Sequence, residues 1–302
     1  MKIFITGGAG FIGRNLAGYL LDNHKVTIYD NLSNSSKENI QSLLEKGVKF
    51  QYGDILDYQE LEKSCAGYDL VIHLAAKSDV AESVINPEKT YEVNVAGTKN
   101  VLRCCVKNKI EKLIFASSAA VYGDCNFRID EKVTPNPLSP YGKSKLDAEK
   151  EIEKFTKENN IHAISLRMFN VYDLQDSKQP GVIPKFIRNV LDDNPIVING
   201  DGKQTRDFVF IGDVISAFDC AIRHIDGKKG NAYNIATGNS VSIQDVAKII
   251  IQKSGKEIEI KHKDQLQSDI KNSETSVVLA KKDLEFTAKH NVLDDLSEFF
   301  EN

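Results

Sequence analysis

The sequence of 302 residues has no long hydrophobic run and no recognisable export signal. Nothing in it approaches the roughly 18 consecutive apolar residues of a transmembrane helix, so no association with a membrane is expected. The first ten residues, MKIFITGGAG, are a short apolar run that ends in glycines, whereas a signal peptide would continue with an apolar core. This start is typical of a buried strand, and a cytoplasmic location is predicted.

The chain also lacks the cysteine patterns of disulfide-rich and zinc-binding proteins. Its five cysteines have no CxxC spacing and no histidine at ligand spacing: Cys65, Cys104, Cys105, Cys125 and Cys220. Disulfide pairing and zinc coordination are therefore poor interpretations, and we take the five as reduced structural thiols. No metal site is predicted.

Positive charge is not in excess either, since the formal net charge is -4 at pH 7. Without a basic field the chain has little to attract nucleic-acid phosphates, so no nucleic-acid partner is expected. The composition, 41% hydrophobic and 27% charged residues, is that of an ordinary globular protein. Its length allows one large domain or two that share an interface.

The first half of the chain alternates short apolar runs with amphipathic stretches. Strands are predicted at Lys2–Thr6, Lys25–Asp30, Val48–Tyr52, Leu70–Leu74, Leu113–Ser117 and His162–Met168. Helices are predicted between them at Phe11–Asn23, Tyr58–Cys65, Pro87–Lys107 and Tyr141–Asn160. This alternation predicts an α/β fold with a doubly wound parallel (Rossmann) sheet and right-handed crossovers.

The regular alternation of strands and helices ends at about residue 167, and a smaller C-terminal α/β lobe is expected after it. Asn170–Pro184 is predicted as a loop, and Gln244–Ser254 as a helix with Ser242 at its N-cap. A short strand is predicted at Glu257–Lys261, before polar loop and a final helix. Ligands of open α/β sheets bind at the carboxyl edge of the sheet, over which this lobe would pack.

A glycine-rich turn follows the first predicted strand and opens the first predicted helix. Gly7, Gly10 and Gly13 have the spacing of a dinucleotide-binding fingerprint, which permits a tight turn and the close approach of a pyrophosphate. Asp30 lies 20 residues after Gly10, where a carboxylate would accept hydrogen bonds from both ribose hydroxyls of NAD. Because it would repel a 2′-phosphate, NAD is predicted rather than NADP. The alternative is that Asp30 only begins a turn.

The domain prediction follows from this fingerprint and from the end of the strand–helix alternation at about residue 167. We expect an NAD-binding Rossmann domain over residues 1–168. Residues 169–302 would mainly form a substrate-binding lobe, with some segments returning to the first domain. Asp54 and Ile55 follow the third predicted strand, where Asp54 would accept a hydrogen bond from the adenine amino group and Ile55 would pack on the ring. Taken alone, these two residues are equally consistent with a plain turn.

A tyrosine and a lysine four residues apart share one face of a predicted helix, Tyr141 and Lys145. A phenol has a pKa of about 10, too high for a general base at neutral pH. The Lys145 ammonium and the positive nicotinamide of NAD⁺ would stabilise the phenolate and lower that pKa. Ser118, at the end of a predicted strand, would hydrogen-bond the same substrate oxygen. Together they predict a catalytic set of Ser118, Tyr141 and Lys145.

In this order the motifs resemble the extended short-chain dehydrogenase/reductase family, that is, the NAD-dependent epimerases and dehydratases. They are TGGAGFIG (6–13), DNL (30–32), GDI (53–55), HLAA (73–76), NVAGTKN (94–100), SSAAVYG (117–123), YGKSK (141–145), RMFNVY (167–172), GDGKQTRDFVFIGDV (200–214) and YNIATG (233–238). The resemblance covers residues 1 to about 240. It is closest to UDP-glucose 4-epimerase and related nucleotide-sugar epimerases.

The resemblance implies roles for further residues. Asn94 would lie beside the Tyr–Lys pair, and Phe169 would lie against the nicotinamide. Asn170 would contact the substrate phosphate, and Arg206 would pair with the nucleotide diphosphate. The other residues that it implies in NAD binding are Phe11, Ile12, Asn31, Leu74, Ala75 and Ala76. His73 is interpreted as a buried histidine with satisfied hydrogen bonds, outside the site.

The resemblance also implies the reaction. Dehydratases of the family carry acidic residues just after the catalytic hydroxyl, where this chain has Ala119 and Ala120. We therefore expect epimerisation at C4 of a nucleotide sugar, such as a UDP-hexose or its N-acetyl equivalent, through a transient 4-keto sugar. The alternatives are another nucleotide-sugar oxidoreductase or dehydratase and, less favoured, a non-enzymatic NAD-binding regulator. A homodimer through the helices at 87–107 and 141–160 is also implied.

Two segments depart from the family pattern. Relatives often have Gly-Pro-Arg after the Asn-Val-Tyr, where this chain has Asp-Leu-Gln at 173–175. An arginine that clamps the diphosphate in the C-terminal lobe has its counterpart within residues 266–269, Leu-Gln-Ser-Asp, so Lys261 or Lys263 would have to substitute for it. Ser273 stands about where some relatives carry a tyrosine, and a small residue there would admit an N-acetyl group.

Overall fold

The computed structural model describes residues 1–125, 127–176, 181–264 and 270–300. The chain folds into two compact units. The first comprises Met1–Gly123, Pro135–Arg167 and Ile215–Tyr233, and the second comprises Asp124–Thr134, Met168–Val214 and Asn234–Asn302. The chain thus changes unit between residues 167 and 168, next to the expected boundary. In addition, residues 124–134 belong to the second unit and residues 215–233 to the first.

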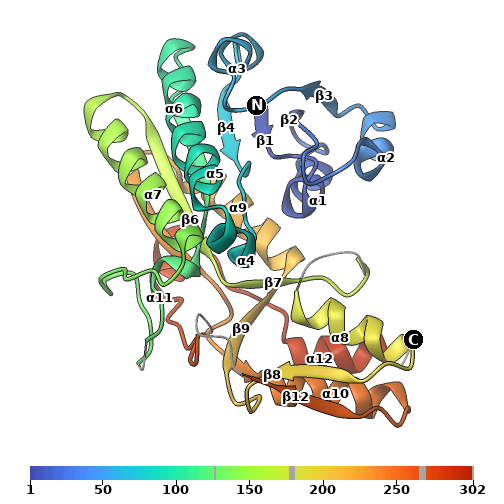
Figure 1. Ribbon diagram of the computed structural model, residues 1–302. Helices are drawn as coiled ribbons and strands as arrows, with labels where there is room; N and C mark the ends of the chain where they lie inside the picture. The colour runs from blue at the N-terminus through green and yellow to red at the C-terminus, as the bar shows by residue number, and fades with distance from the viewer. Residues whose placement is uncertain (126, 177–180, 265–269, 301–302) are drawn as a thin grey trace. The chain divides into compact units, whose positions relative to one another are not determined.

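A seven-stranded sheet forms the centre of the first unit, in the order β10-β6-β5-β4-β1-β2-β3 (Figure 1). Its strands are β1 (Lys2–Thr6), β2 (Lys25–Asp30), β3 (Lys49–Tyr52), β4 (Leu70–His73), β5 (Lys112–Ser118), β6 (His162–Met168) and β10 (Lys229–Ile235). The pairs β1–β2, β1–β4, β2–β3 and β4–β5 are parallel. The doubly wound α/β prediction is confirmed, and the six predicted strands are found with ends that differ by at most one residue.

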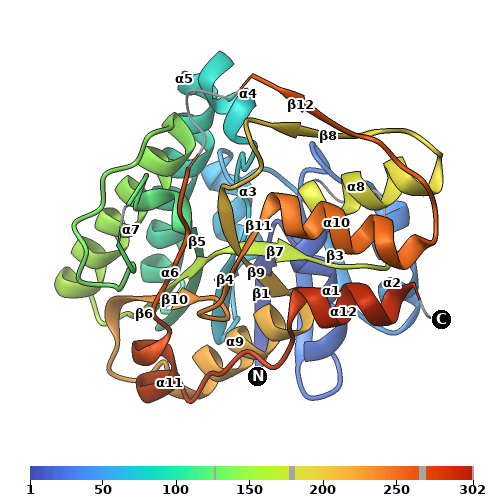
Figure 2. The same cartoon turned by 90° about the horizontal axis from the view of Figure 1, so that it is seen from below.

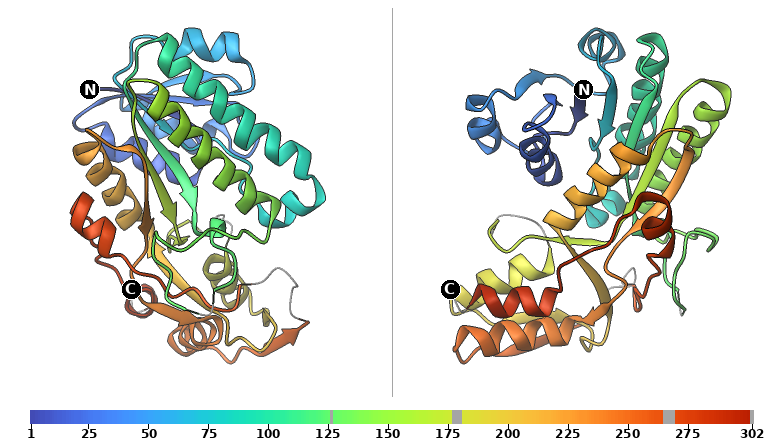
Figure 3. Two further views of the ribbon diagram at one scale, coloured as in Figure 1. Left: turned by 90° about the vertical axis from the view of Figure 1, so that its left-hand side faces the viewer. Right: turned by 180° about the vertical axis from the view of Figure 1, so that it is seen from behind.

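Helices cover this sheet. They are α1 (Phe11–Leu20), α2 (Gln41–Glu45), α3 (Tyr58–Ser64), α4 (Val80–Ile85), α5 (Pro87–Tyr91), α6 (Gly97–Lys107), α7 (Pro140–Glu158) and α9 (Ile211–His224). Between α5 and α6 the predicted helix contains a π-helical turn, η2 (Glu92–Ala96). Helices α6 and α7 lie side by side on one face (Figure 3, left), where their apolar side chains share a core with Phe4 and Phe115 of the sheet.

The second unit contains two small sheets and its own core. Its strands are β7 (Asn170–Tyr172), β8 (Ile196–Asn199), β9 (Thr205–Phe210), β11 (Ser240–Ser242) and β12 (Ile260–Lys263), and its helices are α8 (Val182–Leu191), α10 (Ile243–Ser254), α11 (Val278–Leu284) and α12 (Val292–Phe299). One sheet has the order β11-β9-β7 and the other pairs β12 with β8. Helices α8, α10 and α12 pack around a shared apolar core (Figure 2).

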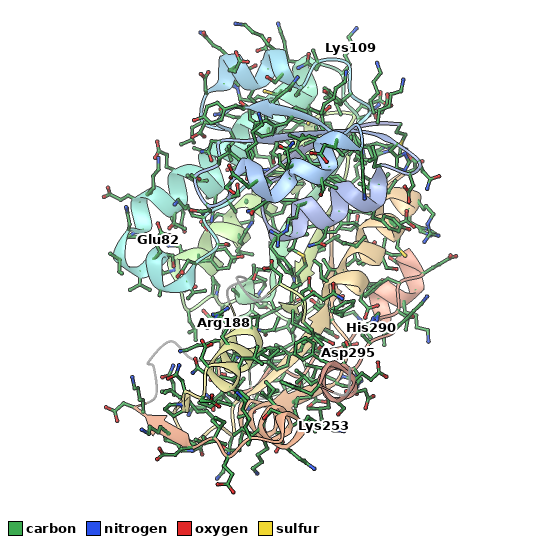
Figure 4. The ribbon with its side chains drawn as sticks, turned by 90° about the vertical axis from the view of Figure 1, so that its right-hand side faces the viewer. Glu82, Lys109, Arg188, Lys253, His290 and Asp295 are labelled. Carbon is green, nitrogen blue, oxygen red and sulfur yellow. The ribbon has the colours of Figure 1, made fainter. Side chains whose placement is uncertain are left out.

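Polar contacts attach the C-terminal stretch within this unit. The Tyr172 hydroxyl donates to Asp295 Oδ2 at 2.5 Å, which connects β7 to α12. Asp213 Oδ2 lies 3.2 Å from His290 Nδ1 and accepts the backbone N–H groups of Lys289 and His290. His290 and Asp295 are labelled in Figure 4.

Two local predictions for this unit were partly wrong. The segment predicted as a loop, Asn170–Pro184, begins with β7 and ends within α8. Strand β7 is only three residues long and exists because it pairs with β9, a contact far along the chain. The strand predicted at Glu257–Lys261 instead begins at Ile260, which is the register that pairing with Ile196 of β8 sets.

Some features are absent from the part of the chain that the structure describes. Over those residues no helix is long and apolar enough to cross a membrane. Within the same ranges, no group of three or more His, Cys, Asp or Glu side chains is placed to hold a metal ion. All five cysteines are buried thiols.

The start of α10 provides a test of local stability. Ser242 is its N-cap, as predicted, and its Oγ accepts the Asp245 N–H at 3.0 Å. Ser242→Ala leaves that N–H without its side-chain acceptor and should lower the free energy of unfolding by about 1 kcal/mol. Ser242→Asp, which keeps an acceptor, is the matched control. Equal stability of Ser242→Ala and the wild type in urea denaturation would contradict this role.

Candidate functional site

The glycine-rich turn between β1 and α1 is built by close backbone packing. Gly7 has φ +69°, and a Cβ there would lie 2.5 Å from the Ala75 nitrogen. A Cβ on Gly13 would lie 2.5 Å from the Gly8 Cα. Gly10 is the N-cap of α1 and has no side chain to occupy the first N–H groups of the helix. Those groups and the helix dipole make the turn suitable for an anion.

The ends of β2 and β3 bring the predicted ribose and adenine residues together. Asp30 Oδ2 accepts the Ala9 N–H of the glycine turn at 3.0 Å, and its Oδ1 accepts the Leu32 N–H at 2.8 Å. Asn31 Nδ2 donates to Asp54 Oδ2 at 2.8 Å. The carboxylate of Asp30 is thus oriented by the same turn that would receive the pyrophosphate.

Ile55, the residue predicted to pack on the adenine ring, is buried against the start of α6. It is 4% exposed, and a Cβ on Gly97 would lie 2.4 Å from its Cδ1. Ile55 therefore packs under the start of α6. Of the other residues implied in cofactor binding, Phe11 and Ile12 begin α1, and Leu74, Ala75 and Ala76 follow β4.

Asn94 lies in the π-helical turn η2 and connects the loop after β4 to the start of α7. Its Oδ1 accepts the Lys77 N–H at 2.8 Å, and its Nδ2 donates to Lys77 O and to Ser144 Oγ, each at 2.9 Å. The Ser144 hydroxyl in turn donates to the Tyr141 carbonyl at 2.7 Å. Asn94 thus lies beside the start of α7, as expected, and π-helical turns are often found at functional sites.

His73 completes a buried chain of hydrogen bonds between β1 and η2. Its Nδ1 lies 2.7 Å from Thr6 Oγ1, and its Nε2 lies 2.9 Å from Thr98 Oγ1. Thr98 gives its only hydroxyl proton to Asn94 O, so Nε2 must carry the ring proton and Nδ1 must accept from Thr6. Burial, with the charge of Lys145, lowers the pKa of His73 to about 3, so the ring is neutral. The interpretation as a satisfied buried histidine is confirmed.

The structure brings Ser118, Tyr141 and Lys145 together at the carboxyl end of β5. Ser118 ends that strand, and its Oγ accepts the Ala120 N–H at 3.2 Å. Tyr141 and Lys145 lie one turn apart on α7, with the Lys145 Nζ 6.0 Å from the centre of the tyrosine ring. The Lys145 ammonium donates to the Ala116 carbonyl at 2.8 Å.

Burial and hydrogen bonds set the protonation of this group. Burial raises the pKa of Tyr141, and a hydrogen bond with Ser118 opposes that rise. Burial lowers the pKa of Lys145 to about 7, and the attraction of Glu149 opposes that fall. The hydrogen bond with Ser118 thus acts on the Tyr141 pKa in the same direction as the effect that sequence reasoning assigned to Lys145.

The start of α7 depends on residues that sequence reasoning missed. Ser139 is the N-cap and its Oγ accepts the Gly142 N–H at 3.1 Å, while Ser83 Oγ accepts the Tyr141 N–H at 3.2 Å. A Cβ on Gly142 would lie 2.4 Å from the Ala120 carbonyl oxygen. The Ser-Pro that precedes Tyr141 was a usable signal for the helix start. The contact at Gly142 had no signal, because Ala120 comes from another element.

Three further residues with implied roles lie in the second unit: Phe169 for the nicotinamide, and Asn170 and Arg206 for the substrate. The Phe169 N–H donates to Ile235 O at 3.0 Å, and Asn170 begins β7 as an exposed residue. Arg206 lies on β9, and its Nη1 donates to the carbonyls of Thr205 and Ile270 at 2.7 and 2.6 Å. These contacts orient the guanidinium from the backbone.

The departures from the family pattern are placed only in part. Residues 266–269, where the diphosphate arginine was sought, lie outside the described residues. Lys261 and Lys263 are exposed on β12, and Lys261 pairs with Glu259 at 3.3 Å. Ser273 is buried, and its N–H donates to Thr205 Oγ1 at 3.3 Å.

Gly142→Ala tests the contact between α7 and the loop after β5. In a helix, alanine is normally favoured over glycine by about 1 kcal/mol, so any loss must come from this contact. We expect a net loss of about 1–3 kcal/mol in thermal unfolding, the usual cost of overpacking. Gly18→Ala in α1 is the control, since its Cβ would meet only the flexible end of Leu43 at 3.3 Å. A Gly142→Ala protein that is more stable than the wild type would contradict this prediction and show that the contact leaves room for a side chain.

Comparisons with known proteins agree with this geometry. The model of the NAD dependent epimerase/dehydratase family matches residues 3–236. A putative UDP-glucose 4-epimerase of Methanocaldococcus jannaschii is 41% identical over 259 residues, which are 84% of this chain and 82% of the relative. A dTDP-D-glucose 4,6-dehydratase of Dictyostelium discoideum is 38% identical over 269 residues, 83% of this chain and 61% of the relative.

A solved structure shows the same likeness in three dimensions. It is a UDP-N-acetylglucosamine 4-epimerase from Methanobrevibacter ruminantium M1 in complex with UDP-N-acetylmuramic acid. The two share a TM-score of 0.92 and 32% sequence identity, over 99% of this chain and 97% of that one. The family model matches most of this chain, and a relative is 41% identical to it. The chain therefore belongs to the NAD dependent epimerase/dehydratase family.

Proposed function

We propose that the protein is an NAD-dependent nucleotide-sugar 4-epimerase that acts on a UDP-hexose or its N-acetyl equivalent. The observation that carries the proposal is the set Ser118, Tyr141 and Lys145 at the carboxyl edge of a Rossmann sheet, with Ala119 and Ala120 next to the serine. Alanine side chains cannot move protons, so the site supports oxidation and reduction at one carbon without elimination.

The residues at this edge fit NAD. Gly7 and Gly13 let the turn pack closely on neighbouring backbone, and Gly10 places no side chain over the first N–H groups of α1, which can therefore meet a pyrophosphate. Asp30 presents a carboxylate, which suits the two ribose hydroxyls and would repel a 2′-phosphate. When bound, NAD⁺ supplies the redox chemistry, the reversible transfer of a hydride.

The remaining chemistry belongs to the residues of the chain. Tyr141 is the proposed base that removes the proton of the sugar 4-hydroxyl, and its hydrogen bond with Ser118 lets both groups reach the same oxygen. The Lys145 ammonium stabilises the phenolate, because a nearby positive charge favours the anionic form. The 4-keto sugar then presents its other face for reduction, and Tyr141 returns the proton. The configuration at C4 is thereby inverted.

The substrate contacts are proposed from the second unit. Arg206 is suited to the diphosphate because backbone carbonyls already orient its guanidinium, so little freedom is lost on binding phosphate. Asn170 is proposed for the phosphate and Phe169 for the face of the nicotinamide. Two of the similar proteins carry UDP sugars in their names, which supports uridine diphosphate as the carrier here.

We further propose a cytoplasmic homodimer formed through α5–α6 and α7. Helices α6 and α7 lie side by side, with an ion pair of 3.0 Å between Lys99 and Glu151. Val106 of α6 is 41% exposed, so this helix has an apolar side chain that a partner helix could cover.

Proton NMR of the sugar tests the proposed reaction. We expect the protein with catalytic NAD⁺ to convert UDP-glucose or UDP-N-acetylglucosamine into its galacto epimer, visible in the anomeric region. Tyr141→Phe should reduce the rate at least about 100-fold, because general acid–base catalysis contributes that much, while NAD remains bound.

The same spectra separate the competing activity. The 38% identical relative is named as a dehydratase, so a second candidate is 4,6-dehydration. That reaction would remove the C6 oxygen and give a new methyl signal. Unchanged spectra with both sugars, from protein shown to hold NAD, would rule out the UDP-hexose epimerase.

A further inference from the structure

A buried ion pair lies one helical turn beyond Lys145, and the proposed reaction does not use it. Arg167 Nη2 donates to Glu149 Oε2 at 2.7 Å, and both side chains are 8% exposed. Arg167 Nε donates to Glu149 Oε1 at 3.0 Å and to Oε2 at 3.3 Å, so the guanidinium holds both carboxylate oxygens. Burying two charges costs free energy, and a well-packed apolar pair is often as stable. Stability alone is therefore a weak explanation for this pair.

The pair joins three elements of the first unit, β5, β6 and α7. The Ser117 hydroxyl, on β5 directly before Ser118, forms a short hydrogen bond with Glu149 of α7. Arg167, near the end of β6, donates from Nη1 to the Tyr122 hydroxyl at 2.8 Å. Tyr122 follows the short 3₁₀ turn that begins after Ser118. The end of β5 is thus held on both sides of the catalytic serine.

Glu149 also faces Lys145, because residues four apart share one face of a helix. Lys145 is 3% exposed, and its ammonium donates to the Ala116 carbonyl of β5. The other titratable groups around it are Tyr141 of α7 and the neutral His73 of β4. Arg167 of β6 forms its ion pair with Glu149. Glu149 is therefore the negatively charged group that acts on Lys145.

We propose that Glu149 is a positioning residue of the active site, which keeps the Lys145 ammonium charged and in place and fixes the strand end that carries Ser118. The inference rests on the proposed function, because Lys145 and Ser118 have their catalytic roles there. Glu149 contacts neither substrate nor cofactor in this account. It acts through the two residues that do.

The electrostatic part has a definite sign. Burial lowers the pKa of Lys145 to about 7, and the negative charge of Glu149 opposes that fall. Below this pKa the ammonium is charged and can stabilise a phenolate, and above it the amine is neutral. Removing the charge of Glu149 lowers the pKa of Lys145 further, so the active form is lost at a lower pH.

Glu149→Gln tests the charge, since glutamine keeps the shape and can still hydrogen-bond Ser117 and Arg167. The readout is the titration of the Lys145 ¹³Cε signal by NMR, assigned by its loss in Lys145→Met. We expect the midpoint to fall by about one pH unit, and the alkaline limb of kcat to move with it. Glu153→Gln is the matched control, because Glu153 pairs with Lys157 at the surface one turn further along α7.

Ser117→Ala tests the positioning part, because it removes the hydrogen bond and keeps the charge. It should lower kcat at least about tenfold at every pH without moving the alkaline limb. If Glu149→Gln does not fold, Glu149→Gln with Arg167→Met removes the unpaired arginine and should show the same shift of Lys145. A folded Glu149→Gln protein with an unmoved Lys145 midpoint would overturn the proposal.

The failure of this inference can be told from the failure of the proposed function. The lysine titration is measured without substrate, so it does not depend on which reaction is catalysed. A shifted midpoint in a chain that epimerises neither UDP sugar would keep the electrostatic role and reject the epimerase. Normal epimerisation with an unmoved midpoint would keep the epimerase and reject the role of Glu149.

Discussion

The close packing of helix α7 on the end of strand β5 is the constraint on which the site depends. The Ala120 carbonyl occupies the space that a side chain at Gly142 would need, because a Cβ added there would lie 2.4 Å from the carbonyl oxygen. This contact lets the Tyr141 phenol meet Ser118, and it lets the Lys145 ammonium reach Ala116. The arrangement of three reactive side chains thus follows from a backbone contact in which none of them takes part.

The glycine turn and helix α7 of the first unit are connected by one buried polar network. It runs from Thr6, before the glycine turn, through His73 and Thr98 to Asn94, and from there to Ser144 on α7. Every member has its hydrogen bond, which is required of polar groups at this depth. Because the network has one consistent protonation pattern, it favours one relative placement of the glycine turn and α7.

Local patterns in the sequence predicted much of this. The glycine spacing, Asp30 and the Tyr–Lys pair depend on strand–turn–helix order and helical period, and Ser242 depends on capping preference; each is a short-range property. The partnership of Glu149, Arg167 and Ser117 joins three distant segments, and no local pattern marks it. Strand β7 escaped prediction for the same reason, since three residues form a strand only through their partner β9. The roles of Phe169, Asn170 and Arg206 in binding stay predictions.

The central claim is that C4 is oxidised and reduced by hydride transfer while the chain moves only the hydroxyl proton. Epimerisation of the UDP sugar in D₂O, followed by NMR of the product at C4, tests it most directly. The account predicts an epimer that keeps its original hydrogen at C4, because the hydride returns from the cofactor and never exchanges with water. Deuterium at C4 of the product would mean that a base removes the proton from carbon itself, and would contradict the account.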